Sequence, residues 1–226
     1  YLVTEWGATG HWEVGKTAWG APIENDSTTK ANLYEKRFET VIAADRKLCL
    51  GSYVFLWGHK QERTPTWYGM FLETGEETPA VDVMQYLWTG AWPAVRSPQL
   101  EGAWLDGKTA YQNIHLKPGQ NYTAKVLATD YNNNALAFVW DVMKENADLK
   151  IGGDIETKPE SLPDLIQDAH DNEITLKAPS QPGPYRLFTY VFDGKGHAAH
   201  VNIPFYVDQT GMPSLFQTRQ ISKAKD

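Results

Sequence analysis

The sequence predicts a fold in two parts, an α/β region followed by an all-β region. Three observations indicate this division. Up to about residue 92, apolar runs typical of strands alternate with stretches of helical periodicity. After that point, short runs with a period of two residues follow one another, separated by clusters of turn residues. The Trp residues are also unevenly distributed along the chain, because only Trp104 and Trp140 of the nine come after Pro93.

The expected elements of the first region alternate in type. The strand YLVTEW, residues 1–6, leads into a long loop rich in Gly and Pro. A helix is expected at residues 29–46, where apolar residues recur at helical spacing. The next strand, LGSYVFLW at residues 50–57, is apolar throughout, as strands buried on both faces are. After a second long loop, the last helix begins at Thr78–Pro79, with Pro in the favoured first position.

The second region reads as a β-sandwich. In the run ALAFVWDVM, the residues Leu136, Phe138 and Trp140 fall on one face, which suits the inner face of two packed sheets. The span of residues 93–208 is close to the roughly 100 residues of an immunoglobulin-like sandwich. The expected strands are YTAKVLATD, ALAFVWDVM, EITLKA, YRLFTYVFD and AAHVNIPFYV.

A domain boundary is expected where TGAWPAVRSPQ combines one Gly with two Pro residues. The sequence therefore divides into an α/β domain at residues 1–92, a sandwich domain at residues 93–208 and a C-terminal tail at residues 209–226 that is expected to fray. The chain has no initiator Met and starts within an apparent strand, so we expect it to be a piece of a longer protein.

Composition excludes several classes of protein. The formal net charge is −7, whereas nucleic-acid binding needs a concentrated basic face. No apolar stretch reaches the roughly 18 residues of a membrane span. A single cysteine, Cys49, rules out an intrachain disulfide or a multi-cysteine metal site. We expect no metal and no cofactor.

The first strand ends in a lone carboxylate, Glu5, which is followed by Trp6 and Gly7. Glycoside hydrolysis uses two carboxyl groups that flank the glycosidic bond. Aromatic side chains near such an acid can pack against the apolar faces of a sugar ring. The alternative is that Glu5 forms a structural ion pair or caps the following loop.

Two motifs in this region show a family resemblance. YLVTEWG resembles the seventh strand of retaining glycoside hydrolases with a (β/α)8, or TIM, barrel, where a strand ending in Glu-aromatic-Gly carries the nucleophile. LGSYVFLWG resembles their eighth strand, whose terminal Trp forms the floor of a sugar subsite. The likeness is to family 2-like barrels and covers roughly residues 1–90. It implies that the α/β region supplies the last two βα units of a TIM barrel.

The resemblance also implies roles for particular residues. Glu5 would be the catalytic nucleophile, and Trp57 would stack under the sugar. The acid/base of that family lies on a fourth strand, which this chain does not contain. The only Asn-Glu pair, Asn172–Glu173, precedes an antiparallel-type strand and is rejected. The chain alone would therefore hold half of a two-acid mechanism and be inactive.

Other loop residues are candidates for substrate binding. His11 and Trp12 follow Glu5, and they either line a subsite or belong to a plain loop. Glu62 follows Trp57, and it either binds sugar hydroxyls or faces solvent. Trp67 is either a platform for a sugar or a plug that holds its loop in place. The substrate-binding candidates are thus Trp57, Trp6, His11, Trp12, Trp67 and Glu62.

The sequence-based hypothesis is the C-terminal part of an exported bacterial glycoside hydrolase that cleaves β-linked glycosides with retention. Its partner would be an oligo- or polysaccharide. An upstream barrel segment or another chain would complete the sheet. The second region resembles the immunoglobulin-like or PKD-like accessory modules of secreted enzymes, on the motif PGPYRLFTYVFDGKGHAA. The alternatives are a non-catalytic carbohydrate-binding module and a structural module of an exported protein.

Overall fold

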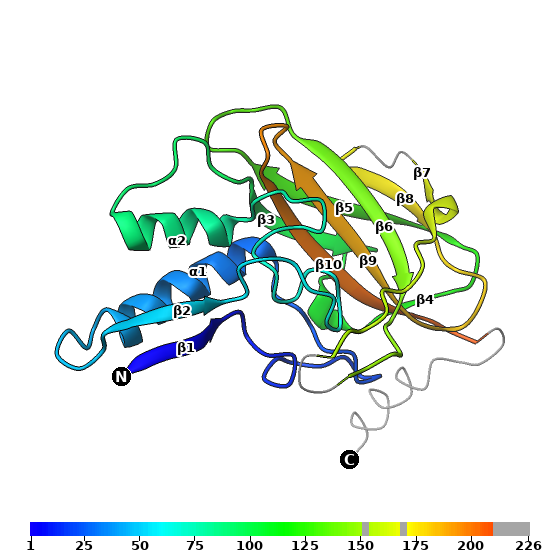
Figure 1. Ribbon diagram of the computed structural model, residues 1–226. Coiled ribbons are helices and arrows are strands. Elements are labelled where there is room, and N and C mark those ends of the chain that lie inside the picture. The colour runs from blue at the N-terminus through cyan, green and yellow to red at the C-terminus, as the bar shows by residue number, and fades with distance from the viewer. Residues whose placement is uncertain (151–153, 168–170, 210–226) are drawn as a thin grey trace, which may run out of the picture.

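The computed structural model describes residues 1–150, 154–167 and 171–209. Within these residues, eight of the ten strands form two four-stranded sheets, and the other two form a parallel pair that lies beside two α-helices (Figure 1). The two four-stranded sheets occupy one side of the molecule and the helices occupy the other. Both strands of the parallel pair run toward the four-stranded sheets, so that their carboxyl ends face them.

The two four-stranded sheets come from residues 99–207. One sheet has the order β4–β10–β9–β6, in which only the β4–β10 pair is parallel. The other has the order β3–β5–β8–β7 and is antiparallel throughout. The bounds are β3 Gln99–Leu105, β4 Ile114–Leu116, β5 Asn121–Thr129, β6 Ala137–Lys144, β7 Ile166–Gln167, β8 Glu173–Lys177, β9 Gly183–Phe192 and β10 Ala198–Val207.

Alternation along these strands builds one core between the two sheets. In β6, Trp140 and Val142 are buried while Val139 is 41% exposed, because successive side chains of a strand point to opposite faces. The core joins residues of both sheets, with Val126 of one sheet and Phe205 of the other fully buried in it. The five strands expected from the sequence are present as β5, β6, β8, β9 and β10.

The N-terminal part has a smaller core of its own. It contains β1 (Leu2–Gly7), α1 (Ser27–Arg37), the π-helical turn η1 (Phe38–Ile42), β2 (Gly51–Phe55) and α2 (Pro79–Thr89). Trp6, Tyr34 and Met84 belong to its apolar cluster, which unites one face of the β1–β2 pair with both helices.

Local sequence explains where the helices begin and end. Asp26 caps α1, since its side chain accepts a 2.8 Å hydrogen bond from the Thr29 N–H. Helix α2 begins as expected, with Thr78 before Pro79. It ends at Thr89 and is capped by Gly90, which adopts the left-handed conformation (φ = 77°) that glycine accepts without steric cost.

The predicted barrel is wrong, and with it the resemblance to family 2-like barrel glycosidases. The described chain is dominated by strands and holds only two α-helices. Strands β1 and β2 pair in parallel with α1 between them in the chain, yet in the described residues this sheet has no further strand. The apolar runs predict two strands and a crossover helix. They do not indicate which segments surround those strands.

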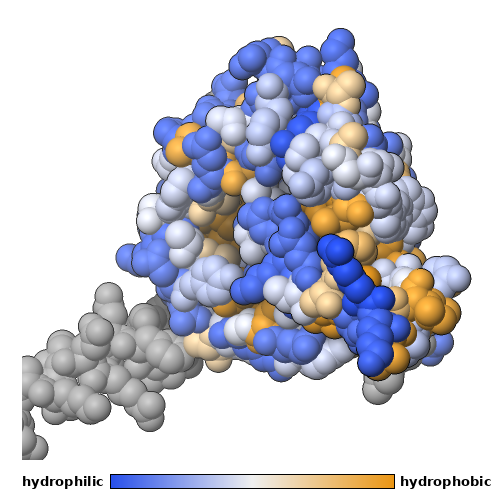
Figure 2. All heavy atoms as spheres, turned by 90° about the vertical axis from the view of Figure 1, so that its left-hand side faces the viewer, coloured by the Kyte–Doolittle hydropathy of each residue, from blue (hydrophilic) through white to orange (hydrophobic). Residues whose placement is uncertain are grey.

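The expectation that the strand LGSYVFLW is buried on both faces is also wrong. Tyr53 of β2 is 67% exposed, and Leu2 of β1 is 51% exposed, because α1 and α2 cover only one face of the pair. Figure 2 views the molecule from the side of β1 and β2, and hydrophobic patches alternate there with hydrophilic ones. An apolar run is therefore no evidence here for a strand covered on both faces.

The expected boundary near residues 92–98 separates the two apolar clusters in sequence, although the division into domains stays a prediction. In the acidic stretch after β6, Glu156 is buried, with 3% of its surface exposed. Apart from Gln209, the predicted C-terminal tail lies outside the described residues. No helix among the described residues combines the length and the apolar character needed to cross a membrane.

Candidate functional site

The carboxyl ends of β1 and β2 lie side by side, since Gly7 pairs with Phe55. The long loops that follow these strands therefore start from one edge of the sheet. In open α/β sheets, ligands bind outside the carboxyl ends of parallel strands. This edge, with residues 8–13 and 56–71, is called the loop edge below.

Glu5 lies just before the end of β1, inside an irregularity of the strand pairing. Val3 pairs with Ser52 and Trp6 pairs with Val54. Three residue positions of β1 therefore lie opposite two of β2, and β1 contains one extra residue. Bulges of this kind redirect side chains, and both Thr4 and Glu5 are exposed. Among the described residues, the Glu5 carboxylate has no hydrogen bond and no ion pair. It is therefore open to a ligand.

Arg37 of α1 holds the start of the first loop. Its guanidinium donates hydrogen bonds to the carbonyl oxygen of Gly7 and, at 2.8 Å, to the hydroxyl oxygen of Thr9. The Trp67 indole N–H donates to the carbonyl oxygen of the same Thr9 at 2.9 Å. The loop after β1 is thus tied both to a helix and to the loop after β2.

His11 is the point where the two loops meet. Its backbone N–H donates to the Tyr68 hydroxyl at 3.3 Å, and its Nε2 lies 3.6 Å from a carboxylate oxygen of Glu62. Its ring meets the edges of Trp12 and Trp67 at centroid distances of 4.9 and 6.0 Å. Burial lowers the pKa of His11, and the neighbouring Arg63 cation acts in the same direction. The imidazole is therefore neutral near pH 7 and can accept a proton or a hydrogen bond.

Glu62 is shared between His11 and Lys60. Its second carboxylate oxygen lies 2.5 Å from the Lys60 ammonium, on the side away from His11. The pair is only partly exposed, with 22% and 19% of the side-chain surfaces accessible. Glu62 thus joins the polar part of the loop edge instead of facing bulk solvent.

The aromatic candidates occupy different environments. Trp12 is 66% exposed at the loop edge, while Trp67 is 1% exposed. Trp57 is 52% exposed and packs against Phe71 and Trp88, at centroid distances of 5.2 and 5.6 Å. Two indole rings therefore remain accessible to a ligand. Trp67 is buried and holds the two loops together through its hydrogen bond to Thr9.

Trp6 lies on the helix side of the sheet. It is 9% exposed and packs against Tyr34 and Phe38, with centroids 5.7 and 5.8 Å away. Little of the Trp6 surface is therefore accessible to a ligand, and the subsite role of Trp6 stays a prediction. The structure brings His11, Trp12, Glu62 and Trp67 together. Among the described residues, Glu5 and Trp57 make no hydrogen bond, ion pair or ring contact with these four.

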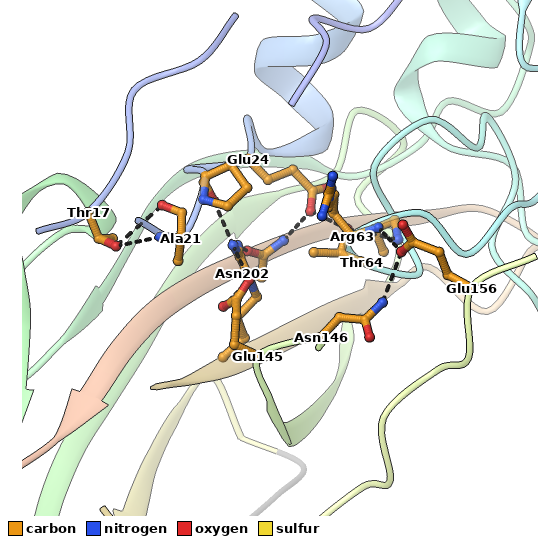
Figure 3. A network of polar contacts seen from close by, with 12 residues as sticks. Thr17, Ala21, Glu24, Arg63, Thr64, Glu145, Asn146, Glu156 and Asn202 are labelled. Atoms are coloured by element: carbon orange, nitrogen blue, oxygen red, sulfur yellow. Dashed lines mark hydrogen bonds and ion pairs between the residues drawn. The ribbon is translucent and has the colours of Figure 1, made fainter. Parts of the chain in front are cut away.

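A buried network of polar residues connects the loops to the sandwich (Figure 3). Glu24 accepts hydrogen bonds from Lys30 at 2.5 Å, from Thr64 at 2.6 Å and from Asn202 at 2.5 Å. Burial would raise the Glu24 pKa, but the Lys30 ammonium outweighs it and holds the pKa at about 2. This carboxylate is therefore ionised at any ordinary pH.

Arg186 and Glu156 extend the network. Arg186, 2% exposed, binds Glu145 through two nitrogens at 2.8–3.0 Å and donates to Asn202 at 2.7 Å. Glu156 accepts from the Arg63 backbone N–H at 2.6 Å and from the Asn146 amide at 2.9 Å. Sequence reasoning missed these residues, since their partners lie far away in the chain and no spacing connects them.

Comparison with known proteins adds no family assignment. No family model matches the sequence, and no curated protein matches it. Among solved structures, the chain is similar to a nucleoside hydrolase-related hypothetical protein from Saccharophagus degradans that is associated with carbohydrate metabolism, at 14% identity and a TM-score of 0.36. That match covers 62% of this chain and 34% of the other, so this chain spans about a third of that protein.

Two further structures match about half of the chain. A chimeric titin Z1Z2 is 17% identical, with a TM-score of 0.27 over 51% of this chain and 98% of its own. CopC from Methylosinus trichosporium OB3b is 15% identical, with a TM-score of 0.27 over 52% of this chain and 99% of its own. Similarities this low assign no function.

Proposed function

We propose that this chain contributes the nucleophile and part of the sugar-binding surface of a glycoside hydrolase that acts on β-linked glycosides with retention. The observation that carries the proposal is the Glu5 carboxylate, which is exposed and unpaired among the described residues at the carboxyl end of a parallel strand. A structural acid would be expected to have a cation or a hydrogen-bond donor beside it. Glu5 has neither among the described residues.

The loop edge supports the sugar-binding part of the proposal. Trp12 and Trp57 offer accessible aromatic faces, and His11 and Glu62 offer polar groups. Carbohydrate sites combine apolar walls with a few placed polar groups that fix orientation. Neutral His11 accepts a hydrogen bond from a sugar hydroxyl, while the carboxylate of Glu62, which pairs with Lys60, accepts another.

In the proposed reaction, Glu5 attacks the anomeric carbon and forms a covalent glycosyl-enzyme, while a second carboxylic acid protonates the leaving oxygen. Water then hydrolyses the intermediate, with the second acid acting as base. That acid comes from a segment that is not among the described residues. We propose that it arrives with further strands, from upstream in the natural chain or from another chain, which pair with the open edges of β1 and β2.

Covalent trapping tests the assignment of Glu5. The natural full-length protein is incubated with 2-deoxy-2-fluoro-glycosides that carry a good leaving group, and the mass increase is measured and mapped to a peptide. The label is expected on the peptide containing Glu5 and is expected to vanish in Glu5→Gln. Glu39→Gln removes an exposed carboxylate from η1 and serves as the matched control that retains labelling. A label that persists in Glu5→Gln refutes the proposal.

The second candidate is a non-catalytic carbohydrate-binding module. The exposure of Trp12 and Trp57 favours it as much as it favours an enzyme. In this case oligosaccharides shift the Trp fluorescence of the chain, Trp12→Ala weakens the shift, and no fluoro-sugar becomes attached. Export from a bacterial cell, to the periplasm or beyond, is part of both proposals, and cell fractionation tests it.

A further inference from the structure

A pocket of about 310 Å³ lies between the first long loop and the sandwich. Residues 16 and 19–22 form one wall, the segment 145–149 with Pro184 forms another, and His11 and Arg63 come from the loop edge. The volume is at the lower end of the range for small-molecule sites, which run from about 300 to 1,000 Å³. A single small ligand fits better than a stretch of polymer.

The first wall is held in a fixed shape. The backbone N–H of Thr17 donates to Ala21 and that of Ile23 donates to Gly15, each at 2.9 Å, which closes a hairpin-like loop. Gly20 allows the turn with its φ of 87°. The loop is fastened to the sandwich through its Ala18 N–H, which donates to Asn113 at 2.7 Å.

The second wall is equally constrained. Glu145 is bound through both oxygens by Arg186, and Asn146 is 8% exposed and donates to the buried Glu156. Glu156 also fixes the backbone of Arg63. The pocket is therefore formed without a ligand and needs little reorganisation to accept one.

The pocket presents positive charge and hydrogen-bond donors. Lys16 has no ion pair with the described residues, and the Arg63 side chain has none either. Within the same part of the chain, the Trp19 indole N–H and the Arg63 Nε are buried without a hydrogen-bond partner. A buried donor without a partner destabilises the folded state, so a ligand that accepts a hydrogen bond from it relieves that cost. The negative charge of Glu145 is balanced by Arg186. The site thus favours an anion that accepts several hydrogen bonds.

Trp19 adds an apolar surface to these charges. Its ring is held against His115 and Tyr206, with centroids 5.5 and 5.7 Å away. A rigid aromatic wall next to cationic donors suits a ring that has both apolar C–H groups and a carboxylate. Inorganic anions use only the charges, and neutral sugars leave the charges unused.

We infer that this pocket binds a carboxylated pyranose, of the hexuronic acid class, with Lys16 and Arg63 facing the carboxylate and Trp19 packing beside the ring. The choice of a sugar rests on the proposed function. The pocket shares His11 with the loop edge, and its ligand is either the acidic unit of a longer substrate or a free acidic sugar.

Titration calorimetry on the chain tests this inference with matched pairs of probes. D-Glucuronate and D-galacturonate are compared with D-glucose and D-galactose, and sodium sulfate serves as a free anion. One of the uronates is expected to bind at least about tenfold more tightly than its neutral counterpart, as for a hydrogen bond to a charged group. Binding of sulfate as tight as that of the uronate, or no uronate binding at all, overturns the inference.

Three variants connect binding to the pocket. Lys16→Met and Arg63→Gln are each expected to weaken uronate binding about tenfold or more, and Trp19→Phe removes the indole N–H but keeps a ring. Lys177→Met changes the net charge equally at an exposed position of β8 and is expected to leave binding unchanged. Circular dichroism checks that each variant folds. An equal loss in Lys177→Met contradicts the site.

The result of the uronate-binding test can be distinguished from the result of the test of the proposed function. Glu5→Gln is expected to leave uronate binding intact, because Glu5 does not line the pocket. Uronate binding without fluoro-sugar trapping supports the pocket and refutes the nucleophile. Trapping without uronate binding refutes the pocket alone.

Discussion

The Arg186 guanidinium, in the middle of β9, donates a 2.5 Å hydrogen bond to the carbonyl oxygen of Pro22, which is 164 residues earlier in the chain. The same side chain binds Glu145 and Asn202. One residue of the sandwich thus organises both the second wall of the pocket and the loop that forms the first wall.

Replacement of Arg186 by Met is expected to lower the free energy of unfolding by about 3–5 kcal/mol, the cost of leaving a largely buried charge without its partner. Here that charge is the Glu145 carboxylate. Urea denaturation followed by circular dichroism measures the change. Lys125→Met is the control, because its ion pair with Glu173 is about half exposed and contributes at most about 1 kcal/mol. Equal losses in the two variants contradict the prediction.

Glu24 is expected to make stability depend on acid. Its pKa in the folded protein is about 2, below its ordinary value of 4.5, so its stabilising contribution is complete above pH 4.5 and is lost as the pH falls toward 2. In Glu24→Gln this contribution is absent, and the Lys30 ammonium is left buried without a carboxylate. Unfolding free energies from pH 7 to pH 2 are expected to fall less steeply in the variant. Glu101→Gln, at an exposed position of β3, is expected to keep the slope of the original protein.

Asp82 is expected to make stability fall as the pH rises, which is the opposite of the effect of Glu24. Burial raises its pKa to about 6, although two hydrogen bonds from Ser97, at 2.7 and 3.2 Å, oppose the shift. A raised carboxyl pKa means that the folded state holds the proton more tightly than the unfolded state. Stability is therefore lost as the pH rises from about 4 to 6, by an amount on the order of 3 kcal/mol. Asp82→Asn is expected to abolish this loss, and thermal unfolding between pH 4 and pH 7 measures it. A pH profile unchanged in the variant contradicts the assignment.

Solute quenching of Trp fluorescence is expected to separate the indole rings into two classes. Trp12 and Trp57 are more than half exposed and should be accessible to acrylamide, whereas Trp67 is 1% exposed and should be protected. Trp12→Phe is expected to remove part of the accessible emission and to change stability by no more than about 0.5 kcal/mol. Trp67→Phe loses the hydrogen bond to Thr9 and leaves a cavity, and should cost about 1–3 kcal/mol. Equal effects of the two changes contradict the assignment.

Sequence reasoning succeeded where the signal is local. The expected strand AAHVNIPFYV coincides with β10, and the helix predicted from Thr78–Pro79 is α2. Alternation of apolar residues and a Pro at the first helical turn depend on neighbours within a few positions. The short strands β4 and β7 were missed, because three and two residues are too few to establish a period.

Sequence reasoning failed where the environment of a side chain depends on residues that are distant in the chain. The runs around Tyr53 and Leu2 look buried, and their exposure depends on which segments cover the sheet. Asn202 meets Glu24 across 178 positions, and no spacing rule connects them. Glu5, His11 and Glu62 were named as candidates from their places after apolar runs, whereas the contact of His11 with Glu62 required the parallel pairing of β1 and β2.

The charged network between the two apolar clusters has a consequence for how the protein unfolds. If the helices and the sandwich separated while both stayed folded, Glu24 and Asn202 would part, and Arg186 would lose Pro22. The buried Lys30–Glu24 pair would then become partly exposed to water. Separation of the helices from the sandwich is thus unfavourable in free energy at the contact that joins the two clusters. The described chain should melt as one cooperative unit despite its two cores, with a calorimetric enthalpy equal to the van't Hoff enthalpy.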